Sequence, residues 1–257
     1  MPHRPVITLT TDFGTADAYV AAMKGVVLGI NPEATIVDIS HDVGPQQVGQ
    51  AAFILGNAWP YFPPGTIHVV VIDPGVGTER RALLLASDSA FFIAPDNGVL
   101  SYVIEELCGH SGDAPVEAPT PRQLCPKLRA FALTQSRYWR SPVSRTFHGR
   151  DIFAPVAAHL SLGAAPEEMG EAVDSVLAFA VLRSRREAPG VLVGHIVHID
   201  RFGNVVTDIT EADIAAGVAA VEIGGRSIQG LSQTYAQGQG LVALMGSSGR
   251  LEIAVRD

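Results

Sequence analysis

Cysteine is scarce in this chain. Only two cysteines, Cys108 and Cys125, occur among 257 residues, and their spacing matches no zinc-binding or redox motif. A disulfide framework of the kind that stabilises small secreted domains is therefore excluded. We interpret the two cysteines as free thiols in a reducing cytosol.

Long apolar runs are also missing. No stretch approaches the roughly 18 consecutive apolar residues that a membrane-spanning helix needs. The first residues, Met1 to Pro5, lead into a short strand-like segment and not into the apolar core of a signal peptide. We therefore expect a soluble, cytoplasmic protein with no membrane partner.

Positive charge is in short supply. The chain has 18 Lys plus Arg against 26 Asp plus Glu, so its formal net charge is −8. Because phosphate contacts need concentrated Lys and Arg, we expect no nucleic-acid partner. An acidic chain suits a cationic or neutral small molecule better. Apolar residues make up 47% of the sequence, enough to exclude disorder as the main state.

Strands alternate with helices through the first part of the chain. This order predicts an α/β domain with a largely parallel central sheet. The run from Ile67 to Ile72 is apolar apart from His68, as expected for a strand buried on both faces. The expected strands are 6–11, 35–39, 66–72, 82–86 and 91–94, and the expected helices are 17–30, 47–59, 99–107 and 152–162. Between residues 109 and 144 the pattern weakens to one possible strand, 130–134, and we assign this excursion no function.

The periodicity changes after a charged segment, 183–190, that Pro and Gly break. We predict a linker there, and domains at 1–183 and 190–257. The second domain has short strands separated by Gly-rich turns, which is typical of a small all-β barrel. Its expected strands are 191–199, 205–209, 219–223, 226–231, 240–244 and 251–255.

Acidic residues follow the first expected strand. Asp12 stands at its carboxyl end, where α/β sheets bind ligands, and a carboxylate there can accept hydrogen bonds from both hydroxyls of a ribose. Asp17 stands at the expected start of the next helix. Without any ligand, Asp17 would serve as a favourable negative charge at the helix N-terminus.

A tight loop, Asp73-Pro74-Gly75-Val76-Gly77-Thr78-Glu79-Arg80-Arg81, follows the buried strand. Its glycines let the backbone approach a ligand closely. Asp73 and Arg80, seven positions apart, can meet across the loop, either as functional groups or as a structural ion pair that pins the turn. A shift of one residue in the loop would exchange Arg80 with Arg81.

Two further segments carry candidate residues. His148 stands beside Gly149 at the start of an expected helix. A lone histidine is usually structural, so a functional role for His148 depends on its lying close to Asp73 and Arg80 in the fold. In Asp200-Arg201-Phe202-Gly203-Asn204, Phe202 could stack on a planar base and Asn204 could hydrogen-bond a base edge. The alternative for this second segment is an ordinary turn between strands.

Metal ligands are not grouped in the sequence. His195 and His198 are three positions apart on an expected strand, so their side chains point to opposite faces and cannot hold one ion. Without a Cys/His cluster we expect no metal.

Five segments occur in an order that resembles a known family. They are Thr-Asp-Phe-Gly, Asp-Pro-Gly-Val-Gly-x-x-Arg, Ala-Pro-Asp-Asn-Gly at 94–98, Phe-His-Gly-Arg-Asp-Ile-Phe and Asp-x-Phe-Gly-Asn. The chain is similar, from about residue 5 to residue 255, to the adenosine-forming S-adenosyl-L-methionine hydrolases. These are also called SAM hydroxide adenosyltransferases and are related to fluorinases and chlorinases.

The resemblance implies an N-terminal α/β domain, a C-terminal β-barrel and a homotrimer with its substrate between subunits. It implies no cofactor, because S-adenosyl-L-methionine is the substrate. The implied catalytic residues are Asp73, Arg80 and His148. The implied substrate-binding residues are Asp12 and Asp200 for the ribose, Asp17 for the methionine ammonium, Phe202 and Asn204 for adenine, and Ser247 for the amino-acid end. Relatives in this family usually continue after the last strand with an Asn- and Ala-rich segment, from which the resemblance implies backbone contacts to adenine.

The residue types agree with hydrolysis at the ribose C5′ carbon. Methionine is already a good neutral leaving group, so the reaction needs an aligned water and no general acid. Asp73, Arg80 and His148 could position that water and help remove its proton, and the sequence does not tell which of them takes it. Halogenation is the nearest alternative, but the Asp73 carboxylate would repel a halide. A non-catalytic nucleoside-binding protein would not need these three residues together, and a metal-dependent hydrolase lacks a ligand cluster.

Overall fold

The structure is a computed structural model that describes residues 5–109, 118–237 and 240–256. The chain divides into two compact units, Met1–Ala180 and Val181–Asp257, which are described separately here. No helix in the described residues is long and apolar enough to cross a membrane.

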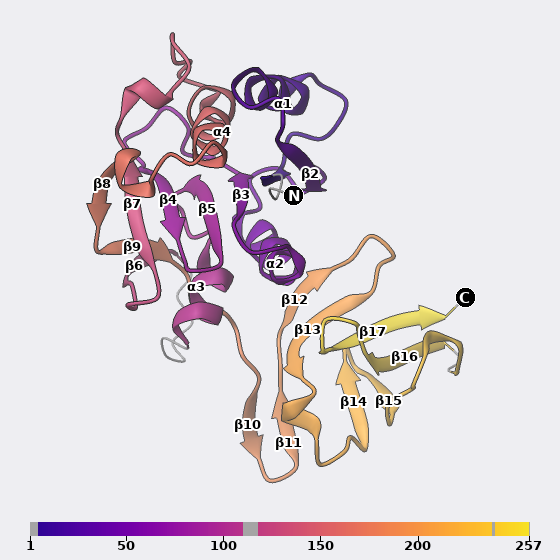
Figure 1. Cartoon of the computed structure of the whole chain (residues 1–257). Helices are drawn as coiled ribbons and strands as arrows, with labels where there is room; N and C mark the ends of the chain where they lie inside the picture. The colour runs from indigo at the N-terminus through magenta and orange to yellow at the C-terminus, as the bar shows by residue number, and fades with distance from the viewer. Residues whose placement is uncertain (1–4, 110–117, 238–239, 257) are drawn as a thin grey trace. The chain divides into compact units, whose positions relative to one another are not determined.

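The first unit is built around a seven-stranded sheet with the order β2-β1-β3-β5-β4-β7-β8 (Figure 1). The strands β2, β1, β3 and β5 run parallel, and β4, β7 and β8 continue the sheet with antiparallel pairs. The predicted α/β architecture is confirmed. The sheet strands are β1 (Val6–Thr11), β2 (Thr35–Ser40), β3 (Thr66–Val71), β4 (Ala82–Ala86), β5 (Ala90–Pro95), β7 (Arg129–Leu133) and β8 (Gly170–Val173).

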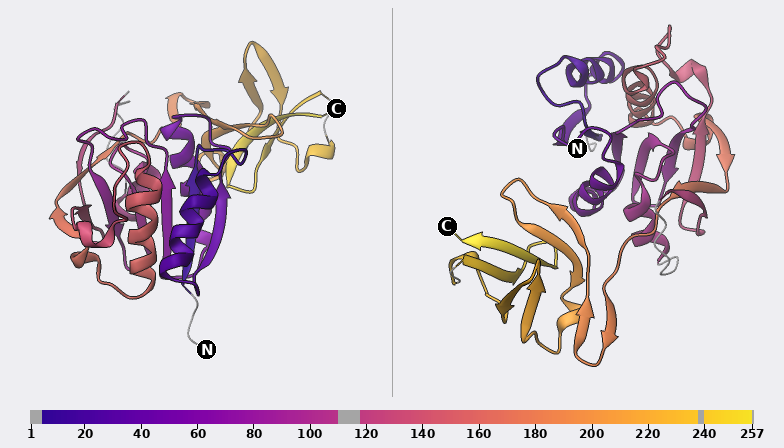
Figure 2. Two further views of the ribbon diagram at one scale, coloured as in Figure 1. Left: turned by 90° about the horizontal axis from the view of Figure 1, so that it is seen from above. Right: turned by 180° about the vertical axis from the view of Figure 1, so that it is seen from behind.

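Helices cover both faces of this sheet, so its central strands are buried on both sides. Successive residues of β3 alternate between the cores: Val69 and Val71 pack in one, and Val70 packs in the other. Figure 2 shows α1 and α4 side by side on one face, while α2 and α3 pack together on the other. The helices are α1 (Tyr19–Ile30), α2 (Val48–Ala58), α3 (Ser101–Cys108) and α4 (Ala154–Ser161), with a π-helical turn at Gly149–Phe153 and 3-10 turns at Trp59–Tyr61, Ser136–Tyr138 and Pro166–Glu168.

The excursion between residues 109 and 144 is more regular than we predicted. Besides β7, its described part contains β6 (Thr120–Gln123), which pairs antiparallel with β9 (Ser175–Ala178) in a second, two-stranded sheet. The sequence missed β6 because Thr120-Pro121-Arg122-Gln123 has no apolar alternation, and its partner lies more than 50 residues away.

The second unit is all-β, as predicted, but the pairing of its described strands does not close into a barrel. A four-stranded antiparallel sheet has the order β12-β13-β17-β16, and β10-β11 and β14-β15 are separate hairpins. The predicted linker contains β10, and the predicted strand 191–199 divides at Gly194 into β11 and β12. The strands are β10 (Arg185–Ala188), β11 (Val191–Val193), β12 (Ile196–Ile199), β13 (Val205–Thr210), β14 (Ala220–Ile223), β15 (Arg226–Gln229), β16 (Gly240–Met245) and β17 (Arg250–Arg256), with 3-10 turns at Ala212–Ile214 and Tyr235–Gln237.

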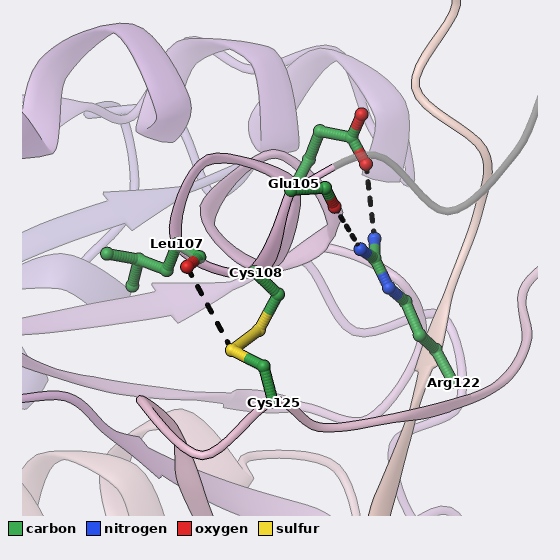
Figure 3. Close-up of a disulfide and its surroundings, with 6 residues drawn as sticks. Glu105, Leu107, Cys108, Arg122 and Cys125 are labelled. Carbon is green, nitrogen blue, oxygen red and sulfur yellow. Dashed lines mark hydrogen bonds and ion pairs between the residues drawn. A yellow bond between two sulfur atoms is a disulfide. The ribbon is translucent and has the colours of Figure 1, made fainter.

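The interpretation of the cysteines as free thiols is wrong. Cys108, at the end of α3, forms a disulfide with Cys125, which precedes β7 (Figure 3). Beside it, Arg122 donates hydrogen bonds to Glu105 at 3.2 Å and to the carbonyl of Gly109 at 2.5 Å. The pairing depends on tertiary proximity, which the spacing of two cysteines does not reveal.

This disulfide is expected to stabilise the first unit. It joins residues 17 positions apart, and closing a loop of that size in the unfolded chain stabilises a protein by about 3 kcal/mol. Adding dithiothreitol, or replacing both cysteines by Ser, should lower the free energy of unfolding measured in urea by this amount. Finding two reactive thiols in the denatured, unreduced protein would contradict the pairing.

A buried histidine makes the stability of the same unit depend on pH. His68 on β3 is fully buried, stacks on Phe92 at 5.1 Å and shares a hydrogen bond of 2.8 Å with Thr8 on β1. Burial lowers the pKa of His68 from 6.5 to about 4, because the charged ring loses its hydration. Between these two pH values the unfolded chain therefore binds a proton that the folded chain excludes.

We expect this exclusion to cost about 3 kcal/mol of stability as the pH falls from about 6.5 to about 4. The double variant T8V/H68F keeps an aromatic ring and leaves no unpaired hydroxyl. Urea unfolding at several pH values should show the wild type losing stability relative to this variant over that range. Parallel pH profiles would show that His68 does not couple folding to protons.

Candidate active site

The candidate site begins where the sheet order reverses. From β1 the chain passes to β2 on one side and later returns to β3 on the other side of β1. Such switch points leave a crevice outside the carboxyl ends of the strands, where α/β sheets bind ligands. Thr11, the last residue of β1, lies opposite Val71, the last residue of β3, so Asp12 and Asp73 follow adjacent strands at this edge.

The loop after β3 folds back on itself and returns Arg80 to Asp73. The amide of Val76 donates to the Asp73 carbonyl at 3.1 Å, and Thr78 Oγ1 donates to the Gly75 carbonyl at 2.7 Å. Gly77 has a φ of +78°, and a Cβ atom there would lie 2.4 Å from the carbonyl oxygen of Arg145. Glycine is required at this position both by its left-handed backbone and by this close approach.

Arg80 bridges the other two predicted catalytic residues. Its Nε donates to Asp73 Oδ1 at 2.8 Å and its Nη2 donates to Asp73 Oδ2. The same Nη2 lies 2.8 Å from Nδ1 of His148. The side chains of Asp73 and Arg80 are only 6% and 11% exposed, so solvent weakens their interaction little. The structure therefore brings Asp73, Arg80 and His148 together.

The bridge defines the protonation of the histidine. A guanidinium can only donate, so Nδ1 of His148 accepts from Arg80, and the neutral ring carries its proton on Nε2. Partial burial lowers the pKa of His148, and the charge of Arg80 lowers it further, while Asp73 and Asp151 oppose this shift. The ring is thus held neutral with an Nε2–H donor.

Asp12 lies at the same sheet edge and is half-buried. Its Oδ2 accepts a hydrogen bond of 2.8 Å from the backbone amide of Gln46. Gln46 has a φ of +63°, and it is the one non-glycine residue with a positive φ in the described part of the chain. Such strain costs about 1 kcal/mol or more and collects at functional sites.

An aromatic cluster joins the Asp12 segment to the His148 segment. The rings of Phe13, Tyr19 and Phe147 contact one another with centroids 5.3 to 5.8 Å apart. Phe13 follows Asp12 directly, and Phe147 precedes His148. The cluster therefore holds the two polar residues in one region of the first unit. Asp17 is exposed two residues before the start of α1 at Tyr19.

The second unit carries the remaining predicted residues. Asp200 closes a tight turn: its Oδ1 accepts from the amides of Phe202 at 2.8 Å and Asn204 at 2.9 Å, and its Oδ2 accepts from Asn204 Nδ2 at 2.9 Å. The Phe202 ring is 89% exposed at the tip of this turn. The Asp200 carboxylate is thus engaged by its own turn.

Ser247 does not lie beside that turn. It is exposed in the connection between β16 and β17, where the amide of Glu211, just past the end of β13, donates to Gly249. The Asp200–Asn204 turn precedes the opposite end of β13. The structure therefore groups Asp200, Phe202 and Asn204, and it places Ser247 at the far end of the same strand.

Both units match known families. Residues 7–170 match the SAM hydroxide adenosyltransferase N-terminal domain, and residues 194–257 match the C-terminal domain of the same family. The chain belongs to the SAM hydroxide adenosyltransferase family. The resemblance inferred from the five segments is thereby confirmed.

Relatives within the family extend over most of the chain. A protein of Thermus thermophilus named (R)-S-adenosyl-L-methionine hydrolase is 38% identical, over 98% of this chain and 92% of that protein. A protein of the same name from Salinispora tropica is 40% identical over 80% of this chain and 72% of that protein. A fluorinase from Actinoplanes sp. is 30% identical over 82% of this chain and 73% of the fluorinase. The solved structure of an uncharacterized conserved protein from Thermotoga maritima has a TM-score of 0.83 and 33% identity, covering 97% and 92%.

The sequence did not predict the residues that support the loop from Asp73 to Arg81. Asn97 Nδ2 donates to the Ile72 carbonyl at 2.8 Å, directly before Asp73. Arg81 is bound to Asp96, with its Nε 2.8 Å from Oδ2, which settles that Arg80 and not Arg81 reaches Asp73. The Ala-Pro-Asp-Asn-Gly segment marks these residues in the sequence. Only the sheet, however, shows that Asp96 binds Arg81 and that Asn97 binds the Ile72 carbonyl.

Gly77 offers a test of this loop. We expect Gly77→Ala to destabilise the protein more than Gly65→Ala, as measured by urea unfolding. Both glycines have a positive φ, +78° and +84°, but a Cβ at Gly65 meets nothing within 4 Å. Gly65→Ala should therefore cost only the backbone penalty of about 1–2 kcal/mol, and Gly77→Ala should add the clash with Arg145. Equal losses would show that Arg145 does not lie against this loop.

Proposed function

We propose that this chain hydrolyses S-adenosyl-L-methionine to adenosine and L-methionine by substitution at the ribose C5′ carbon. The observation that carries the proposal is the Asp73–Arg80–His148 arrangement at the carboxyl edge of the sheet. Relatives named (R)-S-adenosyl-L-methionine hydrolase support the same substrate. No cofactor and no metal are needed in this reaction.

The leaving group makes few demands on the protein. When water oxygen bonds to C5′, the C5′–S bond breaks and its electron pair goes to sulfur, which turns the sulfonium into a neutral thioether. The protein therefore needs no general acid at sulfur. Its tasks are to align water opposite sulfur, to receive a proton, and to exclude other solvent.

We assign those tasks to the triad from its geometry. Both ring nitrogens of neutral His148 are committed, Nδ1 to accepting from Arg80 and Nε2 to carrying a proton, so His148 acts as a donor that orients the water oxygen. Asp73 keeps further lone pairs beyond those that Arg80 engages and accepts the water proton. Arg80 stabilises the hydroxide character that develops during the attack. The proton then passes to solvent.

The remaining predicted residues bind substrate in this proposal. Asp12 accepts hydrogen bonds from the ribose hydroxyls, assisted by Asp200, and Asp17 faces the methionine ammonium. Phe202 stacks on adenine, Asn204 hydrogen-bonds its edge, and Ser247 contacts the amino-acid end. We propose a homotrimer in which the second unit of a neighbouring subunit supplies the adenine-binding residues. The 89% exposure of the Phe202 ring favours an occupant for that turn.

Halogenation is the second candidate, favoured only by the fluorinase relative. The buried Asp73 carboxylate would lie near the nucleophile and repel a halide. A protein that only binds the nucleoside would not need three converging polar residues beside the sheet. We therefore place hydrolysis first.

The proposed location is the cytoplasm, where S-adenosyl-L-methionine would be available as a substrate. The thiol argument for this location is lost, because the cysteines are paired and disulfides are rare in a reducing cytosol. Alkylating cells before lysis and measuring the modified cysteines would establish whether Cys108 and Cys125 are paired in the cell.

Incubation with S-adenosyl-L-methionine in ¹⁸O-labelled water, followed by chromatography and mass spectrometry, tests the proposal. We expect labelled adenosine and methionine from the wild type. Asp73→Ala should reduce turnover at least 10²-fold, because the proton acceptor is lost, while binding measured by calorimetry persists. Added chloride or fluoride should yield no 5′-halo product. Unlabelled adenosine, undiminished turnover by the variant, or a halogenated nucleoside would each contradict the assignment.

A further inference from the structure

We propose that Asp151, a buried carboxylate outside the Asp73–Arg80–His148 triad, is a positioning residue that holds His148 and the Asp73 loop in their working arrangement. The inference rests on the proposed function, because it assigns a role in the same site. It follows from the contacts of one side chain with segments on both sides of the triad.

Asp151 is the best-satisfied carboxylate near the site, and its side chain has no solvent exposure. Arg150 donates from Nε to Oδ1 at 2.7 Å and from Nη2 to Oδ2 at 2.8 Å. The amide of Ser144 also donates to Oδ2, at 2.8 Å, and Arg140 lies 3.4 Å from Oδ1. These partners lower the pKa of Asp151 against the effect of its desolvation, so the group stays ionised.

The first connection runs to His148 through the π-helical turn Gly149–Phe153, which contains Asp151. The amide of Asp151 donates to the Phe147 carbonyl at 3.1 Å, and the Arg150 guanidinium, held by Asp151, lies 5.0 Å from the centre of the Phe147 ring. Phe147, which precedes His148 in sequence, is thus constrained at both its carbonyl and its ring. A π-turn inside a helix is a rare departure that concentrates at functional sites.

Gly149 shows how closely this turn fits the sheet. A Cβ atom at Gly149 would lie 3.2 Å from both Met23 Sδ and Val71 Cγ1. Val71 is the last residue of β3, two positions before Asp73. The turn therefore presses directly on the strand that delivers Asp73, and its anchoring sets the distance from His148 to Arg80.

The second connection runs through the segment 140–147. The amide of Arg140 donates to the Asp151 carbonyl at 2.8 Å, and Ser144 binds its carboxylate. The next residue, Arg145, places its carbonyl against Gly77, in the loop that carries Arg80. One carboxylate thus constrains both His148 and the backbone facing the Asp73–Arg80 loop.

The charge of Asp151 reaches His148 as well. The charged groups that act on the His148 ring are Arg80, which disfavours its protonation, and Asp73 and Asp151, which favour it. Replacing Asp151 by a neutral residue should therefore move the His148 titration to lower pH. This shift reports the electrostatic action of Asp151 on the ring, and a fall in kcat at an unchanged KM reports the positioning role.

The main experiment compares the wild type with Asp151→Asn, which keeps the shape but presents an amide to Arg150 and to the amide of Ser144. We expect kcat for S-adenosyl-L-methionine hydrolysis to fall about 10²-fold, as for a reacting group displaced by about 1 Å. KM should change little, because Asp12 and the second-unit residues are untouched. His148, followed by NMR of ¹⁵N-labelled histidine and assigned with His148→Asn, should titrate at lower pH than in the wild type.

A milder variant guards against misfolding of Asp151→Asn. Arg150→Gln changes a side chain that is 30% exposed and leaves the Asp151 charge in place. It should lower kcat about tenfold without the downward shift of the His148 titration. Glu105→Gln is the matched control. Glu105 is a buried carboxylate on α3 that binds Arg122 on β6, away from the triad. It should cost stability but alter neither kcat nor His148.

The inference is overturned if Asp151→Asn and Arg150→Gln behave like Glu105→Gln, losing stability with an unchanged kcat and an unchanged His148 titration. Failure of the proposed function has a different signature. In that case the wild type itself forms no adenosine, and the His148 titration, which needs no turnover, still decides whether Asp151 acts on this ring.

Discussion

The Arg80 guanidinium is the group on which the site depends. It donates to both oxygens of Asp73 and to Nδ1 of His148, so one rigid, permanently charged fork defines the roles of two titratable neighbours. It also lies 5.4 Å from the centre of the Phe153 ring, which packs against its face. A lysine could neutralise Asp73, but its flexible, point-like ammonium would not offer the fixed fork of donors that joins the carboxylate to the imidazole.

The fold makes this bridge possible by converging distant segments on one sheet edge. Asp73 follows a strand buried on both faces, Arg80 returns through a glycine-dependent loop, and His148 comes from a π-turn beyond the excursion. Two of these segments are held by further polar contacts: Asn97 donates to the Ile72 carbonyl, and the Asp151 carboxylate in the π-turn accepts from the Ser144 amide. The arrangement of Asp73, Arg80 and His148 thus rests on supporting side chains that bind backbone groups.

Local signals in the sequence predicted the parts of the structure that local physics controls. The apolar run ending at Ile72 predicted a central strand, and the spacing of Asp73 and Arg80 predicted their pair. Features that depend on long-range partners escaped prediction. The Cys108–Cys125 disulfide, the β6–β9 pairing and the β13–β17 pairing all join segments whose proximity no periodicity encodes.

The candidate residues of the second unit are held by their own turn, whereas those of the first unit are held by contacts between distant segments. Asp200 uses both carboxylate oxygens to brace its own turn, so the backbone that carries Phe202 is held in place although the ring is 89% exposed. A turn whose backbone is already held in place loses little conformational entropy when its aromatic residue stacks on a planar ligand. Hydrolysis also requires that bulk water be excluded once the substrate is bound. In the proposed reaction, stacking of Phe202 on adenine would contribute to both needs, because it binds the base and removes one of its faces from water.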